Sequence, residues 1–246
     1  MSDFWKFHTR ESFVTIRCKE TRMIKKIYLF YEVNNEDLIK EIKHEKIIII
    51  PVLTNKKRDI SFNIMSQYAN KYLFNQYCII SNNDIYFDKT LKEITKLDFY
   101  NNDYFISLTR KNCDDYITFN NTIWKPHSLS QDSWIFKSPI KQMEPIINLG
   151  WIQCDNIISN QYMKLGYNVI NPHYSINAWH LHKYNETRNL LNNYNYNNKF
   201  DISPVELTNI NKILEKQRIE VNKILMNYSS FKIDRLKNIK TNNLNG

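Results

Sequence analysis

Short apolar runs alternate with stretches of helical periodicity along this chain, and this alternation constrains the fold more than any other feature. Residues 26–33, 46–53 and 103–110 are apolar or β-branched runs between polar segments, which is the pattern of buried strands. From Asp59 onward, apolar residues recur at helical spacing as far as Leu73. Strands that alternate with helices predict an α/β sandwich with a largely parallel central sheet.

One of these runs is followed by a candidate ligand. Cys78–Ile80 is apolar, a polar break with a single carboxylate, Asp84, follows it, and apolar residues resume at Ile85. We therefore expect Asp84 just beyond the carboxyl end of a strand, which is where open α/β sheets bind ligands. Asn82 and Asp84 could give a hard cation two oxygen ligands from one turn. Ordinary turn chemistry explains the same residues equally well.

Composition excludes several classes of protein. The 246 residues contain only Gly150, Gly166 and Gly246, so neither a P-loop nor a glycine-rich dinucleotide loop can be built. A net charge of +9 favours anionic partners, although biased base composition of the gene would also produce it. The four cysteines have no C-x-x-C spacing, which indicates neither a zinc site nor a disulfide framework and fits a reducing compartment.

The sequence contains no segment that we expect to span a membrane. The longest apolar run, residues 47–53, is far shorter than the ~20 residues that span a bilayer. The first residues, Met1 to Lys6, lack the basic and then apolar order of a signal peptide. We expect a soluble, cytoplasmic protein.

A second carboxylate opens a predicted helix. Gly150 and the residues up to Asp155 precede a stretch that is helical in pattern and stops at Gly166, a typical residue just after a helix. Asp155 therefore falls at the N-cap or in the first turn, where free backbone N–H groups favour a carboxylate. It is either a simple helix cap or a functional acid.

Two histidines share one face of a predicted strand. In residues 175–182, His180 and His182 are two positions apart, and strand side chains alternate between faces. Neutral imidazoles would suit a metal and charged imidazoles a diphosphate. A structural role for both remains the alternative.

The C-terminal part has a different pattern. We expect one domain over residues 1–200 and a helical extension with a basic tail over residues 201–246. Ser203 to Glu206 resembles a capping box, and the apolar residues from Leu207 to Leu225 lie at near-heptad spacing. Such a helix either packs on the domain or mediates self-association.

Taken together, these blocks resemble nucleotide-sugar glycosyltransferases of the GT-A fold, over roughly residues 46–190. Residues 80–88 resemble the "ANSDIYFD" form of the D-x-D metal motif of that fold. Residues 150–156, the segment from Lys164 to Pro172 and His180 to His182 resemble the later acidic motif, strand entry and closing histidine. The chain departs from the family pattern at Asn82, where the first acid of D-x-D is usual, and at Cys154, where glutamate is frequent.

The resemblance implies a GT-A-like, Rossmann-type sandwich and a role for each residue. Asp84 would bind Mn²⁺ or Mg²⁺, with His180 or His182 as a further metal contact. Asp155 would be the general base of an inverting enzyme. The remaining candidates would contact the sugar, the acceptor, the ribose or the diphosphate: Asp132, Asn156, Asn82, Asn83 and Arg58.

The expected reaction transfers a sugar from a nucleotide-diphosphate donor, a UDP-sugar being one such donor, to a hydroxyl of a glycan or similar acceptor. Independently of the resemblance, a diphosphate leaving group needs cationic stabilisation, for which Arg58 and Arg188 are candidates. Nucleic acid is not an expected partner. Two alternatives stay open: a two-metal phosphoesterase or nuclease, and a non-catalytic module that binds nucleic acid or sugar.

Overall fold

The structure is a computed structural model that describes residues 17–18, 23–33, 39, 42–54, 60–113, 131–151, 153–181 and 207. The chain divides into two compact units, Met1–Glu206 and Leu207–Gly246. All described elements belong to the first unit, and the expected C-terminal helix lies outside the described residues. None of the helices in the described ranges combines the length and the apolar character needed to span a membrane.

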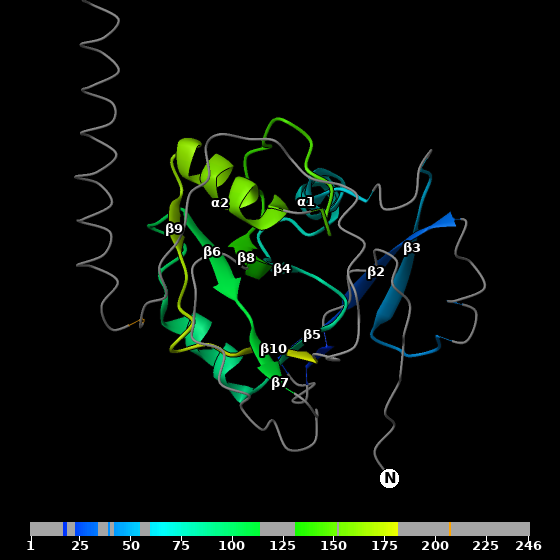
Figure 1. Ribbon diagram of the computed structural model, residues 1–246, viewed down its shortest axis with the longest axis horizontal. Coiled ribbons are helices and arrows are strands. Elements are labelled where there is room, and N and C mark those ends of the chain that lie inside the picture. Colours follow the sequence, from blue (N-terminus) through cyan, green and yellow to red (C-terminus); the bar gives the residue numbers. More distant parts are fainter. Residues whose placement is uncertain are drawn as a thin grey trace, which may run out of the picture. The chain divides into compact units, whose positions relative to one another are not determined.

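The main sheet has four strands in the order β4-β8-β6-β9, with β4 at Tyr77–Ser81, β8 at Gln131–Lys137, β6 at Tyr104–Thr109 and β9 at Asn168–Ile170. β8 is antiparallel to both of its neighbours, whereas β6 and β9 are parallel. Consequently the first residues of β8 lie beside the last residues of β4 and β6. Figure 1 shows β8 between β6 and β4.

Two helices bury their apolar sides in one core with this sheet (Figure 1). α1 (Phe62–Tyr72) begins at Ser61, whose side chain accepts a hydrogen bond from the Ile64 N–H at 3.2 Å. α2 (Cys154–Lys164) ends before Gly166, which has a φ of +90°. The predicted helix stop at Gly166 is therefore confirmed, because glycine adopts this left-handed conformation without steric cost.

The core between helices and sheet is strongly aromatic. Phe62 of α1 packs edge-on against Trp134 of β8, with ring centroids 5.6 Å apart. Tyr162 of α2 stacks on Phe105 of β6 at 3.9 Å. Residues of β6 and β8 that point to the other face, such as Ile106 and Ile135, are fully buried as well. The central strands of the sheet are therefore buried on both faces.

Two smaller sheets complete the described part. β2 (Ile27–Glu32) and β3 (Ile47–Val52) are parallel. The second sheet has the order β1-β5-β10-β7, with β1 at Arg17–Cys18, β5 at Ile85–Phe87, β10 at Ala178–Leu181 and β7 at Lys111–Cys113. A 3₁₀ helix, η2 (Lys89–Lys96), follows β5.

The fold agrees with the expected α/β class only at the coarse level. Helices and strands are mixed as predicted, but β8 makes the main sheet mixed rather than largely parallel. The apolar run of β8 did not reveal its direction, because a strand buried on both faces has the same pattern whether its neighbours are parallel or antiparallel.

Candidate functional site

Asp84 and His180 meet at the end of β4, as expected if both belong to one site. The antiparallel pairing of β5 with β10 sets His180 opposite Ile85, directly after Asp84 in the chain. Asp84 Oδ2 lies 2.9 Å from His180 Nε2. Nε2 donates a hydrogen bond to the Asp84 carboxylate when it carries the ring proton, and without that proton the two side chains could share one metal ion. Two residues ninety-six positions apart thus form a direct contact.

The two partners differ in their access to solvent. The side chain of Asp84 is 47% exposed, whereas that of His180 is 7% exposed. Burial acts to raise the pKa of the Asp84 carboxyl, but the hydrogen bond with His180 and the electrostatic effects of His180 and Arg110 outweigh it. The pKa of Asp84 is therefore below its ordinary value, so this carboxylate is ionised at neutral pH and open to a ligand.

Asp132 is the centre of a second, mostly buried cluster. Arg110 Nη1 lies 3.1 Å from both carboxylate oxygens of Asp132, with side chains 15% and 9% exposed. Asn82 Nδ2 donates to Asp132 Oδ1 at 2.7 Å, and the Asn82 backbone N–H donates to the Asp132 carbonyl at 3.0 Å. The amide of Asn82 therefore points to Asp132 and holds the turn after β4 against the start of β8.

Asp155 lies in the first turn of α2, close enough to Asp132 for the charge of Asp132 to affect it. Gln153 is the N-cap residue, and Asp155 lies in the first turn, where its carboxylate interacts with the Asn156 backbone N–H. Asp155 Oδ2 accepts a hydrogen bond from the Gln131 N–H at 3.1 Å. Desolvation raises the pKa of the Asp155 carboxyl to about 7, and the negative charge of Asp132 adds to this effect. The backbone N–H groups of Asn156 and Gln131 act in the opposite direction.

Arg110 is the charged residue that sequence reasoning missed. It directly follows β6, and the carboxyl ends of β4 and β6 lie at the same edge of the main sheet, so its position was a usable signal.

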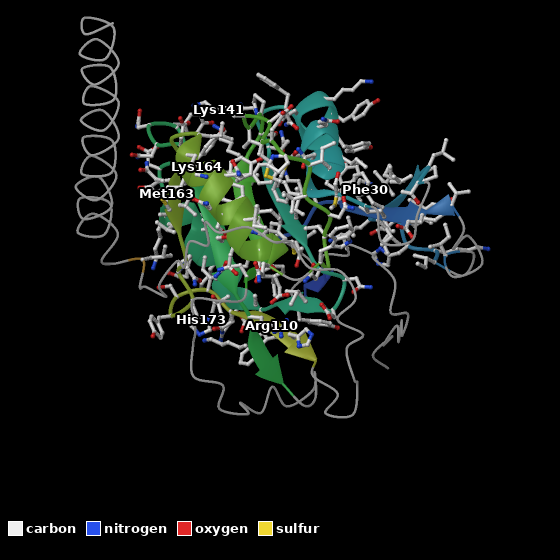
Figure 2. The ribbon with its side chains drawn as sticks, turned by 45° about the horizontal axis from the view of Figure 1, so that its top comes forward. Phe30, Arg110, Lys141, Met163, Lys164 and His173 are labelled. Atoms are coloured by element: carbon white, nitrogen blue, oxygen red, sulfur yellow. The ribbon has the colours of Figure 1, made fainter. Side chains whose placement is uncertain are left out.

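Next to Arg110, the Thr109 carbonyl is 3.1 Å from His173 Nδ1. Figure 2 shows Arg110 and His173 well apart from Lys141 and Lys164, which lie toward the C-terminal end of α2.

Asp88, the second acid of the motif after β4, has a structural role. Its Oδ2 accepts hydrogen bonds from Asn177 Nδ2 at 2.8 Å and Trp179 Nε1 at 2.9 Å, and its Oδ1 accepts one from the Thr90 N–H at 2.9 Å. These bonds tie η2 to β10. Because strand side chains alternate, Trp179 faces Asp88 while His180 faces the other way.

The remaining predicted residues divide into two groups. Asn83 is half-buried in the turn after β4, and Asn156 is buried in α2. Arg58, Arg188 and His182 lie outside the described residues. Among the residues that the structure does describe, no group of three or more His, Cys, Asp or Glu side chains is arranged to hold a metal ion.

A pocket of about 190 Å³ lies elsewhere. It is lined by residues at the start of β6 and the end of β8, such as Tyr104 and Lys137. In the register of the main sheet this is the end opposite Asp132. The pocket is therefore distinct from the candidate site.

Comparison of the chain with protein-family models, curated proteins and solved structures finds no match.

Proposed function

We propose that the chain is a glycosyltransferase that transfers a sugar from a nucleoside-diphosphate donor to a hydroxyl acceptor, with an active site at the carboxyl ends of β4 and β6. The observation that carries the proposal is the contact of 2.9 Å between Asp84 and His180. These residues come from two distant segments that were both expected to hold the metal and its diphosphate. The proposal includes the GT-A-like sandwich, of which the parallel pairs β2–β3 and β6–β9 would be parts.

The donor atoms of Asp84 and His180 fit Mn²⁺ better than Mg²⁺. Asp84 offers carboxylate oxygens and His180 an imidazole nitrogen. Carboxylates suit both Mg²⁺ and Mn²⁺, but imidazole is a ligand for transition metals, so Mn²⁺ fits this pair better. Asp84 and His180 would hold this metal, and its positive charge would help to stabilise the diphosphate leaving group.

Arg110 supplies the fixed positive charge in this proposal. Among the described residues, Arg110 is the cation that pairs with Asp132, and its charge also acts on Asp84. An arginine can bind an anion through several N–H donors at once. Arg58 and Arg188, the cations expected from the sequence, stay candidates for the same task.

Asp155 is the proposed general base. In the reaction its carboxylate would take the proton of the acceptor hydroxyl as the hydroxyl oxygen attacks the anomeric carbon and the bond to the diphosphate breaks. A base is most effective when its pKa lies near the working pH, and the pKa of Asp155 is raised to about 7. Asp132 would act mainly through Asp155, because its charge helps to raise that pKa.

The two-metal phosphoesterase or nuclease is less well supported. Two-metal sites hold their ions ~3.5–4 Å apart with shared carboxylates. Within the described residues, the acids of this region are spread over separate contacts, Asp84 to His180 and Asp132 to Arg110, and no three of them gather at one point. A single-metal site accords better with this separation.

The proposal is tested by thermal-shift measurements with UDP-, GDP-, CDP- and dTDP-sugars, each with and without Mn²⁺. We expect one nucleotide to raise the melting temperature only when Mn²⁺ is present, and Asp84→Asn to abolish this rise. Glu144→Gln is the matched control, because Glu144 is an exposed acid that lines neither the candidate site nor the pocket. Stabilisation by DNA or RNA and by none of the nucleotides would refute the proposal.

A further inference from the structure

The pocket opposite the candidate site is bordered by aromatic rings that remain open to solvent. Phe99 lines the pocket, and the ring of Tyr77, which is 52% exposed, packs edge-on against it at 5.2 Å between centroids. Tyr100 is 78% exposed and its ring lies 3.2 Å from Nζ of Lys137, another lining residue. Exposed rings held in place by packing provide flat apolar surfaces for a ligand.

The polar residues that line the pocket supply both hydrogen-bond donors and hydrogen-bond acceptors. Asn75 and Asp103 are exposed, and Asn102 is half-buried at the rim. Asn75 is fixed in a left-handed conformation with φ +60°, and its N–H donates to the Ser138 carbonyl at 3.0 Å. This backbone hydrogen bond places Asn75 at the rim of the pocket, next to Ser138. Amides both donate and accept, and the carboxylate of Asp103 accepts.

The charges of the lining favour a neutral ligand. Among the described residues that line the pocket, Lys137 is the one basic residue and Asp103 the one acid. The ammonium of Lys137 already lies over the Tyr100 ring, a favourable cation–π arrangement. A phosphate would need cations in excess, as nucleic-acid sites provide. Here the lining has no such excess.

The size of the pocket limits the ligand further. Pockets for drug-sized ligands usually measure ~300–1,000 Å³, whereas this one measures about 190 Å³. A single small ring with several hydroxyls fits, and the exposed rings beside the pocket would contact further units of a chain.

We infer that this pocket, with Tyr77 and Tyr100 beside it, binds one unit of a neutral carbohydrate. Sugar rings combine apolar faces, which pack on aromatic rings, with hydroxyls that both donate and accept hydrogen bonds. The inference does not depend on the proposed catalysis, because the pocket lies at the other end of the main sheet from Asp132 and shares no lining residue with that site.

The test is an NMR titration of the ¹⁵N-labelled full chain with cellotriose, maltotriose, mannotriose and chitotriose. We expect at least one trisaccharide to cause saturable shifts at the backbone amides of residues 99–104 and 137–138. Tyr100→Ala and Asp103→Ala should each weaken the apparent affinity at least tenfold, and both residues are exposed, so the fold should be kept. Ile146→Ala, at a 66% exposed apolar residue away from the lining, should bind like the unmodified chain.

Absence of saturable shifts with all four trisaccharides overturns the inference. So does sugar binding that neither Tyr100→Ala nor Asp103→Ala weakens. Larger shifts at the same amides with an oligothymidylate than with any sugar would also overturn it, because they would indicate a surface for nucleic acid.

Discussion

Arg110 Nη1 lies 3.1 Å from both carboxylate oxygens of Asp132, and this ion pair joins the end of β6 to the start of β8. Both side chains are mostly buried. The pair therefore has two consequences: it stabilises the edge of the sheet, and it positions the charge of Asp132 that acts on Asp155.

The first prediction concerns the stability of this pair. Arg110→Ala leaves the Asp132 charge buried without its cation, and removal of one partner of a buried pair costs about 3 kcal/mol. Urea denaturation should show this loss in the free energy of unfolding. The double variant Arg110→Ala with Asp132→Asn should lose less unfolding free energy than Arg110→Ala and Asp132→Asn lose together as single variants. Additive effects, or a loss below about 0.5 kcal/mol for Arg110→Ala, would mean that the pair contributes little.

The second prediction concerns Asp155 and pH. Its pKa is about 7 in the folded chain, against ~3.9 when unfolded. Between these values the folded state binds more protons, so stability falls as pH rises from about 4 to 7. Asparagine does not titrate, so Asp155→Asn should match the unmodified chain near pH 4 and exceed it at pH 8.

At pH 8 we expect the melting temperature of Asp155→Asn to be higher by about 2–4 °C, which corresponds to roughly 1 kcal/mol in a chain of this size. The value allows for the partial exposure of Asp155, which weakens the effect. Calorimetry across the pH range checks it. A constant difference between the two proteins from pH 5 to pH 8 would show that the pKa of Asp155 is not raised.

The third prediction separates the two acids of the motif after β4. Asp88→Ala removes the acceptor for Thr90, Asn177 and Trp179 and should cost about 2–3 kcal/mol of unfolding free energy. The matched control is Glu93→Ala on the same 3₁₀ helix, whose surface ion pair with Lys96 should contribute less than about 1 kcal/mol. Equal losses in the two variants would contradict the structural role of Asp88.

Sequence reasoning located the elements of this region better than their directions. Asp84 follows β4 as expected, and Asp155 opens α2, because a short apolar run and a helix stop at Gly166 are local signals. The antiparallel direction of β8 depends on tertiary pairing, which a run buried on both faces does not encode. It is this direction that brings Asp132 to Arg110.

The roles of neighbouring polar residues were harder to assign. Asp84 and Asp88 look alike in the motif, yet one contacts His180 and the other ties η2 to Asn177. Asn82 was expected near the ribose or the metal, but its amide donates to Asp132. The pairing of β5 with β10, which joins segments about ninety residues apart, decides which acid contacts His180, and the pairing of β4 with β8 brings Asn82 to Asp132.

The central claim is that Asp84 and His180 together hold the metal of a nucleoside-diphosphate donor. Electron paramagnetic resonance of Mn²⁺ measures this directly, because the signal of the free aqueous ion falls when the ion binds. The account predicts that, with the nucleotide selected by thermal shift, the chain binds one Mn²⁺, and that Asp84→Asn and His180→Ala each leave the ion free. Unchanged Mn²⁺ binding by both variants, or two ions per chain, would contradict it.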